Sequence, residues 1–168
     1  MIAKNLMAFI SAAIFVLLVS LAVRAWKTRI TNQKSQFEEP LEALEYFGST
    51  LVAAKGFYVA TTFANNVLER IAAYGLGARG NAQVLVFSEG LLIVRNGERP
   101  LAIDRSAIQA VSLGQVAIDK AVENNGLIQV NWIQSGIGLA THIRIVEPSD
   151  RQNVYSAILS ITTKEEAK

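Results

Sequence analysis

Few residues in this chain of 168 have side chains that could support catalysis or metal binding. The chain contains no cysteine, which excludes disulfides, thiolate nucleophiles and cysteine-ligated zinc. His142 is the only histidine, and no compact group of carboxylates accompanies it as further ligands. His142 falls on the polar side of a stretch in which apolar and polar residues alternate, so we expect it to be an ordinary surface residue. We therefore predict no catalytic residue, no metal and no cofactor.

The sequence GLGARG at residues 75–80 matches the G-x-G-x-x-G pattern of dinucleotide-binding loops. That pattern holds a pyrophosphate only where a helix leaves the turn, because the phosphate binds at the helix N-terminus. Here the residues that follow, 81–88 (NAQVLVFS), predict a strand. We expect a turn-forming loop that binds no nucleotide.

Basic residues in the predicted loops are sparse. Arg70 and Arg79 are the only ones between residues 64 and 83, and we take them as possible ligand contacts. A pocket that grips a phosphorylated headgroup needs several charge-assisted contacts, so two arginines predict at most weak headgroup binding. A second, loose set of basic residues lies near an Asn-Gly turn: Arg95, Arg99 and Arg105. These arginines are as suited to ion pairs with Glu98 and Asp104 as to ligand contacts.

The pI near 9.0 has a local origin. Four cations and no anion lie between residues 24 and 34, whereas basic and acidic residues nearly balance from residue 55 onward. Aromatic residues are few, at 8%, and no basic stripe is present. Nucleic acid is therefore not an expected partner.

The elements that must position these residues begin with an apolar run, Leu6–Val23, of eighteen residues without a charge. As a helix it would be about 27 Å long, close to the hydrocarbon thickness of a bilayer. The cations that follow it predict one membrane span with the N-terminus outside and the rest of the chain in the cytoplasm. Ser20–Ala22 also offers small residues for signal peptidase, which leaves a cleaved signal as the alternative. The residues expected to contact the membrane surface are Arg24, Trp26, Lys27 and Arg29.

We predict three regions: an anchor at 1–24, a juxtamembrane stalk at 25–55 and one domain at 56–168. Within the stalk, Pro40 begins a short predicted helix (PLEALEYF) whose Leu41, Leu44 and Phe47 could dock on the domain.

The domain is predicted to be mainly β. Period-2 alternation and turn residues define seven antiparallel strands, with no crossover long enough for a parallel unit. A terminal amphipathic helix should follow Pro148, with Ser149 and Gln152 as a capping box and an apolar stripe of Val154, Ile158 and Ile161. The predicted strands are Phe57–Phe63, Val84–Ser88, Leu91–Arg95, Pro100–Ile103, Ala107–Leu113, Leu127–Ile133 and Leu139–Val146.

Seven antiparallel strands closed by one helix match the outline of a pleckstrin-homology-like (PH-like) barrel. The segments YVATTF (58–63), ERIAAYGLGARGNAQVLVFSEGLLI (69–93) and GLIQVNW (126–132), behind an N-terminal span, resemble the single-pass PH-like proteins of actinobacteria. The resemblance covers about residues 57–159 and brings no agreed catalytic residues. It implies a family that is sometimes labelled a transporter or export protein, with genes near those of pyrimidine and arginine biosynthesis.

We therefore expect a non-enzymatic PH-like module that is anchored in the cell membrane and binds a protein partner. The alternatives are an accessory subunit of a membrane transport or export complex and a weak binder of anionic lipid headgroups. A fold outline alone does not decide among them.

Overall fold

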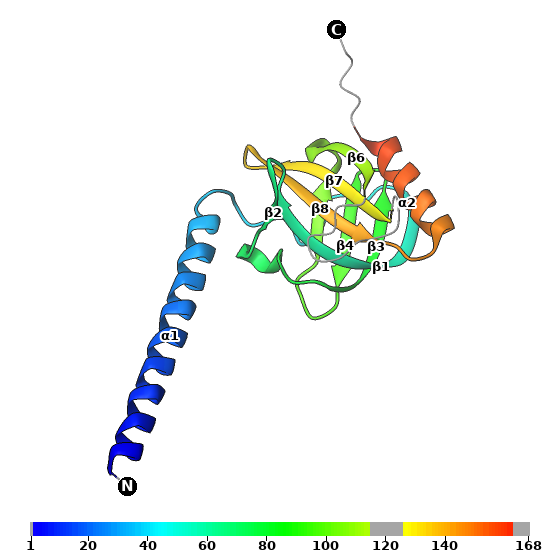
Figure 1. Cartoon of the computed structure of the whole chain (residues 1–168). Helices are drawn as coiled ribbons and strands as arrows, with labels where there is room; N and C mark the ends of the chain where they lie inside the picture. The colour runs from blue at the N-terminus through cyan, green and yellow to red at the C-terminus, as the bar shows by residue number, and fades with distance from the viewer. Residues whose placement is uncertain (1, 115–125, 163–168) are drawn as a thin grey trace.

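The computed structural model describes residues 2–114 and 126–162. Parts of the predicted domain at 56–168 therefore lie outside the described residues. A long helix at the N-terminal end, α1 (Ile2–Lys34), leads to a β-domain that ends in a second helix, α2 (Pro148–Ile161). Figure 1 shows α1 projecting from the domain as a separate rod, with only its C-terminal end beside the sheet.

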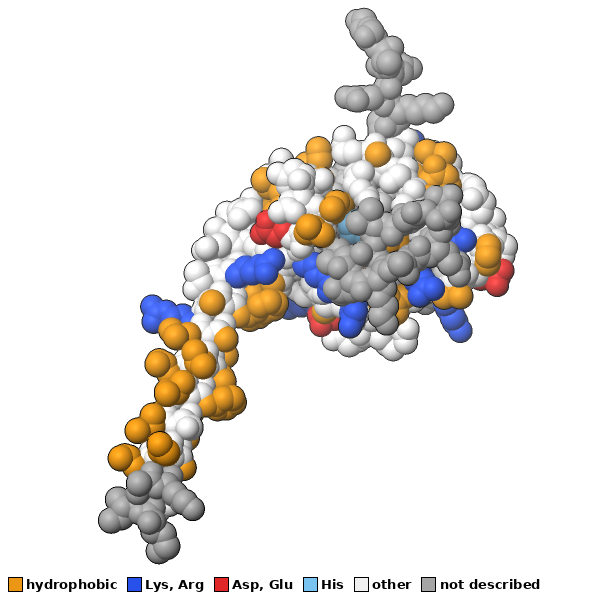
Figure 2. Space-filling model, in the orientation of Figure 1, with side chains coloured by type: hydrophobic (Ala, Val, Ile, Leu, Met, Phe, Trp, Pro, Cys, Tyr) orange, Lys and Arg blue, Asp and Glu red, His pale blue; other side chains and the backbone are white. Residues whose placement is uncertain are grey.

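The predicted apolar run lies within α1, which is long and apolar enough to cross a membrane. None of its most apolar window is buried in the protein, although a signal sequence would have the same properties. Hydrophobic side chains cover the length of this helix, and Lys and Arg side chains gather where it meets the domain (Figure 2). The helix continues well past Val23, to Lys34. Residues 25–34 of the predicted stalk therefore extend the same helix.

Eight antiparallel strands and two 3-10 turns form the domain, which confirms the predicted fold class. Seven strands follow the order β5-β4-β3-β1-β8-β7-β6, and β2 pairs with β1 outside this path. Their bounds are β1 Thr50–Phe63, β2 Asn66–Arg70, η1 Ala73–Gly75, β3 Gly80–Phe87, β4 Gly90–Arg95, β5 Leu101–Asp104, η2 Arg105–Ala107, β6 Ile108–Gly114, β7 Leu127–Gln134 and β8 Ile137–Arg144.

Strand β1 belongs to both halves of the sheet. Its first part, from Thr50 to Tyr58, pairs with β3, and its second part, from Phe57 to Phe63, pairs with β8. At Gly56, near the changeover, a Cβ atom would lie 2.9 Å from the carbonyl oxygen of Arg144. The absent side chain thus lets the two halves approach closely where the sheet folds over.

The core lies between the two halves of the sheet and α2. Val154, Ile158 and Ile161 are buried, as the apolar stripe predicted, and α2 contacts β1, β3, β4 and β6. The largest fully buried side chain is that of Trp132 on β7. The terminal helix is therefore part of the hydrophobic core.

The start of α2 differs from the predicted capping box. Glu147 is the N-cap, Pro148 opens the helix, and no side chain caps the N-terminus. The Ser149 hydroxyl instead donates to Glu147 Oε1 (3.4 Å). Proline fits the first helical turn because it lacks an N–H that would need a partner, so Pro148 begins the helix.

The predicted helix from Pro40 to Phe47 is absent, and this segment is irregular, with bends at Glu42, Ala43 and Glu45. The N–H of Ala102 on β5 donates to the Leu41 carbonyl oxygen (2.8 Å), so the segment covers part of that edge strand. Leu44 is buried, as the docking prediction required, whereas Leu41 is 46% exposed. Backbone pairing with an otherwise open edge offsets the helical preference of a short, isolated segment.

The connection from β4 to β5 spans residues 96–100 and contains the Asn-Gly turn, which is not of type I′. Of Asn96 and Gly97, only the glycine has a positive φ, at 78°. The type I′ turn requires positive φ at both positions. The Arg95 side chain closes this loop instead, by donating to the Arg99 carbonyl oxygen.

Candidate functional site

The main candidate site is the junction where α1 meets the domain, and Gln33 is its central residue. This side chain is 2% exposed, although it lies in the last turn of α1, whose other described side chains are almost all exposed. Its Oε1 accepts hydrogen bonds from the N–H groups of Ala72 (2.7 Å) and Ala73 (3.2 Å), and its Nε2 donates to the Arg70 carbonyl oxygen (3.3 Å). Both ends of the amide are thus used to bind the backbone between β2 and η1.

Arg29, one turn earlier, reinforces the same contact. Its Nη2 donates to the Arg70 carbonyl oxygen (3.0 Å), so two helix residues share one backbone acceptor. Arg29, which we predicted to contact the membrane surface, therefore meets Arg70, which we predicted as a loop ligand contact, at the junction.

Aromatic packing completes the junction on the far side of Gln33. Phe37 is 3% exposed and packs against Phe63 (centroids 6.5 Å apart) and Tyr74 (5.7 Å). The Lys34 ammonium lies 5.2 Å from the Tyr74 ring centroid, within cation–π range. Residues 33–37, in the predicted stalk, are thus packed on the domain.

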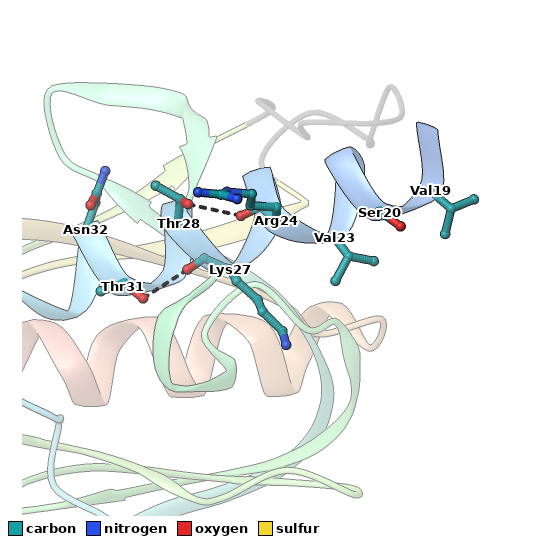
Figure 3. Close-up of a pocket in the computed structure, with 8 residues that line it drawn as sticks. All are labelled: Val19, Ser20, Val23, Arg24, Lys27, Thr28, Thr31 and Asn32. Atoms are coloured by element: carbon teal, nitrogen blue, oxygen red, sulfur yellow. Dashed lines mark hydrogen bonds between the residues drawn. The ribbon is translucent and has the colours of Figure 1, made fainter. Parts of the chain in front are cut away.

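Two grooves flank α1 just before the junction. One, of about 560 Å³, follows the helix from Val19 to Asn32 and includes Arg24 and Lys27 (Figure 3). The other, of about 640 Å³, lies between the helix and β2, where Glu69 forms part of the opposite wall. Arg24, Thr28 and Asn32 border both grooves. The hydroxyl groups of Thr28 and Thr31 donate hydrogen bonds to the backbone carbonyl oxygens of Arg24 and Lys27 (both 3.0 Å; Figure 3). These two hydroxyls therefore bond within α1.

Two of the other predicted site residues are exposed. Trp26 is 55% exposed on the helix, and Arg79 is exposed in the loop before β3. Nothing in the sequence marks Gln33, because a glutamine after a helical run is usually solvated.

A third groove, of about 450 Å³, lies on the outer face of β1, β3 and β4. Asn81, Gln83 and Asn96 contribute side-chain amides, Lys55 contributes an ammonium group and Val94 an apolar contact. Each amide can donate and accept hydrogen bonds, so the groove suits a neutral polar ligand better than a polyanion.

The glycine-rich loop has a structural role. Gly75 ends η1, and the loop leads directly into β3, so no helix follows it, as predicted. Gly75 has φ of 68°, and an added Cβ there would clash with Glu98 Oε2. Arg95 Nη1 donates to the Gly75 carbonyl oxygen (2.7 Å). The loop is thus fixed against the β4–β5 connection.

Arg95 is buried, at 5% exposure, and its guanidinium carbon lies 4.9 Å from the Tyr58 ring centroid. Its guanidinium donates three hydrogen bonds to the carbonyl oxygens of Gly75 and Arg99. Arg99 instead forms ion pairs with Glu39 (2.8 Å) and Glu42 (2.9 Å) in the segment after α1. Arg95 thus holds the glycine-rich loop and the β4–β5 connection, and Arg99 holds the segment after α1.

A buried polar chain runs through the core beside Arg95. Tyr58 OH donates to the Leu76 carbonyl oxygen (2.8 Å) and lies 2.7 Å from Thr61 Oγ1. Thr61 lies 2.8 Å from Thr141 Oγ1, which accepts from Trp132 Nε1 (2.9 Å). Burial raises the pKa of Tyr58 to about 12, so this phenol stays protonated and remains a donor.

His142 is buried, at 3% exposure, which corrects the predicted surface position. All residues from Leu139 to Ile143 are buried, and because successive side chains of a strand point to opposite faces, both faces of β8 are covered here. His142 Nε2 lies 3.3 Å from Thr62 Oγ1. Burial, and to a lesser degree the positive charge of Arg70, lower the pKa of His142 below 6.5. In the described part of the chain, no three histidine or carboxylate groups cluster as metal ligands.

Comparison with known proteins identifies a family that matches this chain. The model of a family described as "Bacterial PH domain-like" matches residues 38–160, starting just after the junction. No protein of curated function matches the sequence significantly. One chain of a solved structure, "The 8S snRNP Assembly Intermediate", aligns with a TM-score of 0.49 and 9% identity over 77% of this chain and 94% of its own. Similarity at that level carries no argument about function.

Proposed function

The chain belongs to the bacterial PH domain-like family, and on this premise we propose that it is a membrane-anchored, non-enzymatic interaction module. In this proposal α1 spans the cell membrane once, and the PH-like domain recruits or scaffolds a protein partner in the cytoplasm. The observation that carries the proposal is the junction at Gln33, because it attaches a folded domain firmly to an exposed apolar helix.

The groove of Lys55, Asn81, Gln83 and Asn96 supports a protein as the partner. A polypeptide backbone presents alternating donors and acceptors, which side-chain amides can match in either direction. The β5 edge is a less suitable surface for strand addition, because Leu41 already pairs with Ala102 there. Lys55 is the only basic residue among those that line this groove, and a phosphorylated headgroup needs several charge-assisted contacts. We therefore favour a protein over a lipid headgroup as the ligand of this groove.

Site-specific photocross-linking in the native membrane tests this proposal. A photoreactive amino acid replaces Gln83 in the groove, and the control carries it at Arg105, an exposed residue of η2. We expect one soluble protein to be cross-linked from position 83 only, and to be lost from the membrane fraction when residues 6–23 are deleted. Cross-links to polytopic membrane proteins would instead favour the accessory-subunit alternative. The absence of any cross-link specific to position 83 would contradict the assigned groove.

A further inference from the structure

The groove between α1 and β2 has the composition of a site for one membrane lipid. Its wall on α1 consists of Leu21, Arg24, Ala25, Thr28, Arg29, Asn32 and Gln33; Gln36 contributes from just after the helix and Glu69 from β2. Leu21 of the apolar run comes first along the chain, Arg24 and Arg29 lie in the middle with Ala25 and Thr28 between them, and the amides come last. This order matches the change from acyl chain to headgroup to water across one leaflet.

The height of the charged group above the bilayer follows from the helix geometry. If the hydrocarbon layer ends at Val23, the six residues to Arg29 raise the chain by about 9 Å. The headgroup layer of one leaflet is roughly 5–8 Å thick. Because Arg29 is bonded to the Arg70 backbone, adjacent Glu69 is held at the same level. Arg24 therefore lies within the headgroup layer, and Arg29 and Glu69 lie just beyond its outer boundary, where the polar end of a headgroup meets water.

We propose that this groove binds one glycerophospholipid, with Arg24 and Arg29 facing its phosphate and Glu69 accepting a hydrogen bond from its polar headgroup. The proposal rests on the membrane span of the proposed function. Two guanidinium groups favour a phosphodiester. Glu69 Oε2 accepts a hydrogen bond from Asn66 Nδ2 (3.4 Å), and a carboxylate has acceptor sites beyond one.

Glu69 also defines which headgroups are preferred. Phosphatidylethanolamine offers N–H donors and phosphatidylglycerol offers O–H donors, whereas the choline of phosphatidylcholine offers none. The site should therefore bind the first two in preference to phosphatidylcholine. The volume of about 640 Å³ is within the range of small-molecule sites. This groove is distinct from the one on β1, β3 and β4.

Native mass spectrometry of the full-length chain, released from nanodiscs with equal parts of the three lipids, tests the proposal. We expect one retained phospholipid, enriched in the ethanolamine and glycerol forms. Arg24→Gln should reduce retention about tenfold, as expected for the loss of a charge-assisted contact. Glu69→Ala should abolish the preference over phosphatidylcholine. Arg105→Gln, with the same charge change on η2, should leave both unchanged.

Two results would overturn the assignment. Equal retention in the wild type and in Arg24→Gln would show that the lipid is only annular, and retention without headgroup preference would remove the role of Glu69. The fluorescence of buried Trp132 establishes that each variant is folded. A chain that enters nanodiscs but retains no lipid contradicts this inference alone, whereas a chain that does not enter them contradicts the membrane span.

Discussion

Substitution of Arg95 should destabilise the domain more than substitution of any exposed arginine. Arg95→Met keeps the aliphatic stem but removes three donated hydrogen bonds, two to the Arg99 carbonyl oxygen and one to that of Gly75. The same change removes a cation from the face of Tyr58. The glycine-rich loop and the β4–β5 connection would then lose the side chain that joins them.

The magnitude follows from these contacts. An acceptor left without its partner costs about 1–3 kcal/mol, with the lower values where water can enter. Two stranded carbonyl groups and one lost cation–π contact, worth about 0.5–2 kcal/mol, are offset by relief of the desolvation of a buried charge. We expect a net loss of about 2–4 kcal/mol in the free energy of unfolding. Because domains are typically stable by about 5–15 kcal/mol, such a loss is readily measured.

Urea denaturation of the full-length chain in nanodiscs provides the assay, with Trp132 fluorescence in a Trp26→Phe background. Arg95→Lys should lose less, since an ammonium group keeps the charge but cannot reach both carbonyl groups with a fork of donors. Arg105→Met, the control, removes an exposed charge. The reasoning would be refuted if Arg95→Met and Arg105→Met shifted the urea midpoint equally.

Three further outcomes are expected. Ile158→Asp places an unpaired charge in the core under α2, at a cost of several kcal/mol, and should abolish cooperative thermal melting; an unchanged melting temperature would contradict the packing of α2. Because the pKa of His142 is lowered, the folded state binds a proton on this ring less well than the unfolded state does. The stability that comes from the neutral ring is therefore present above pH 6.5 and is lost as the pH falls below that value. The urea midpoint should therefore decrease from pH 7 to 5, and less so in His142→Gln; equal decreases would exclude His142 as the cause. A cytoplasmic reporter fused after Lys168 should be active, whereas activity of an exported reporter at that position would reverse the proposed orientation.

The strands and the terminal helix were predictable because their signals are local. Alternation at Ile128, Val130 and Trp132 directly records which face of β7 is buried. Apolar spacing at Val154, Ile158 and Ile161 does the same for α2. In both cases the pattern in the sequence and the burial in the structure have one physical cause.

The errors arise where a distant segment decides the environment. His142 occupies a polar position in its strand, but coverage of both faces of β8 buries it. The segment after Pro40 has helical composition, yet the open edge of β5 offers it a backbone partner. For the candidate site, the cations at Arg24 and Arg29 were predictable from their position after the apolar run. The role of Gln33 was not predictable, because it consists of hydrogen bonds to backbone groups at residues 70–73, and no local sequence pattern connects those residues to Gln33.

The junction at Gln33 has a mechanical consequence for a chain held in a bilayer. No glycine or proline interrupts α1 between the apolar run and the junction, so the helix offers no hinge at which the domain could swivel. Membrane helices adjust to bilayer thickness mainly by tilting, on average by about 20°. A domain fixed to the end of such a lever turns through the same angle, so a thinner membrane would present a different side of the sheet to the cytoplasm.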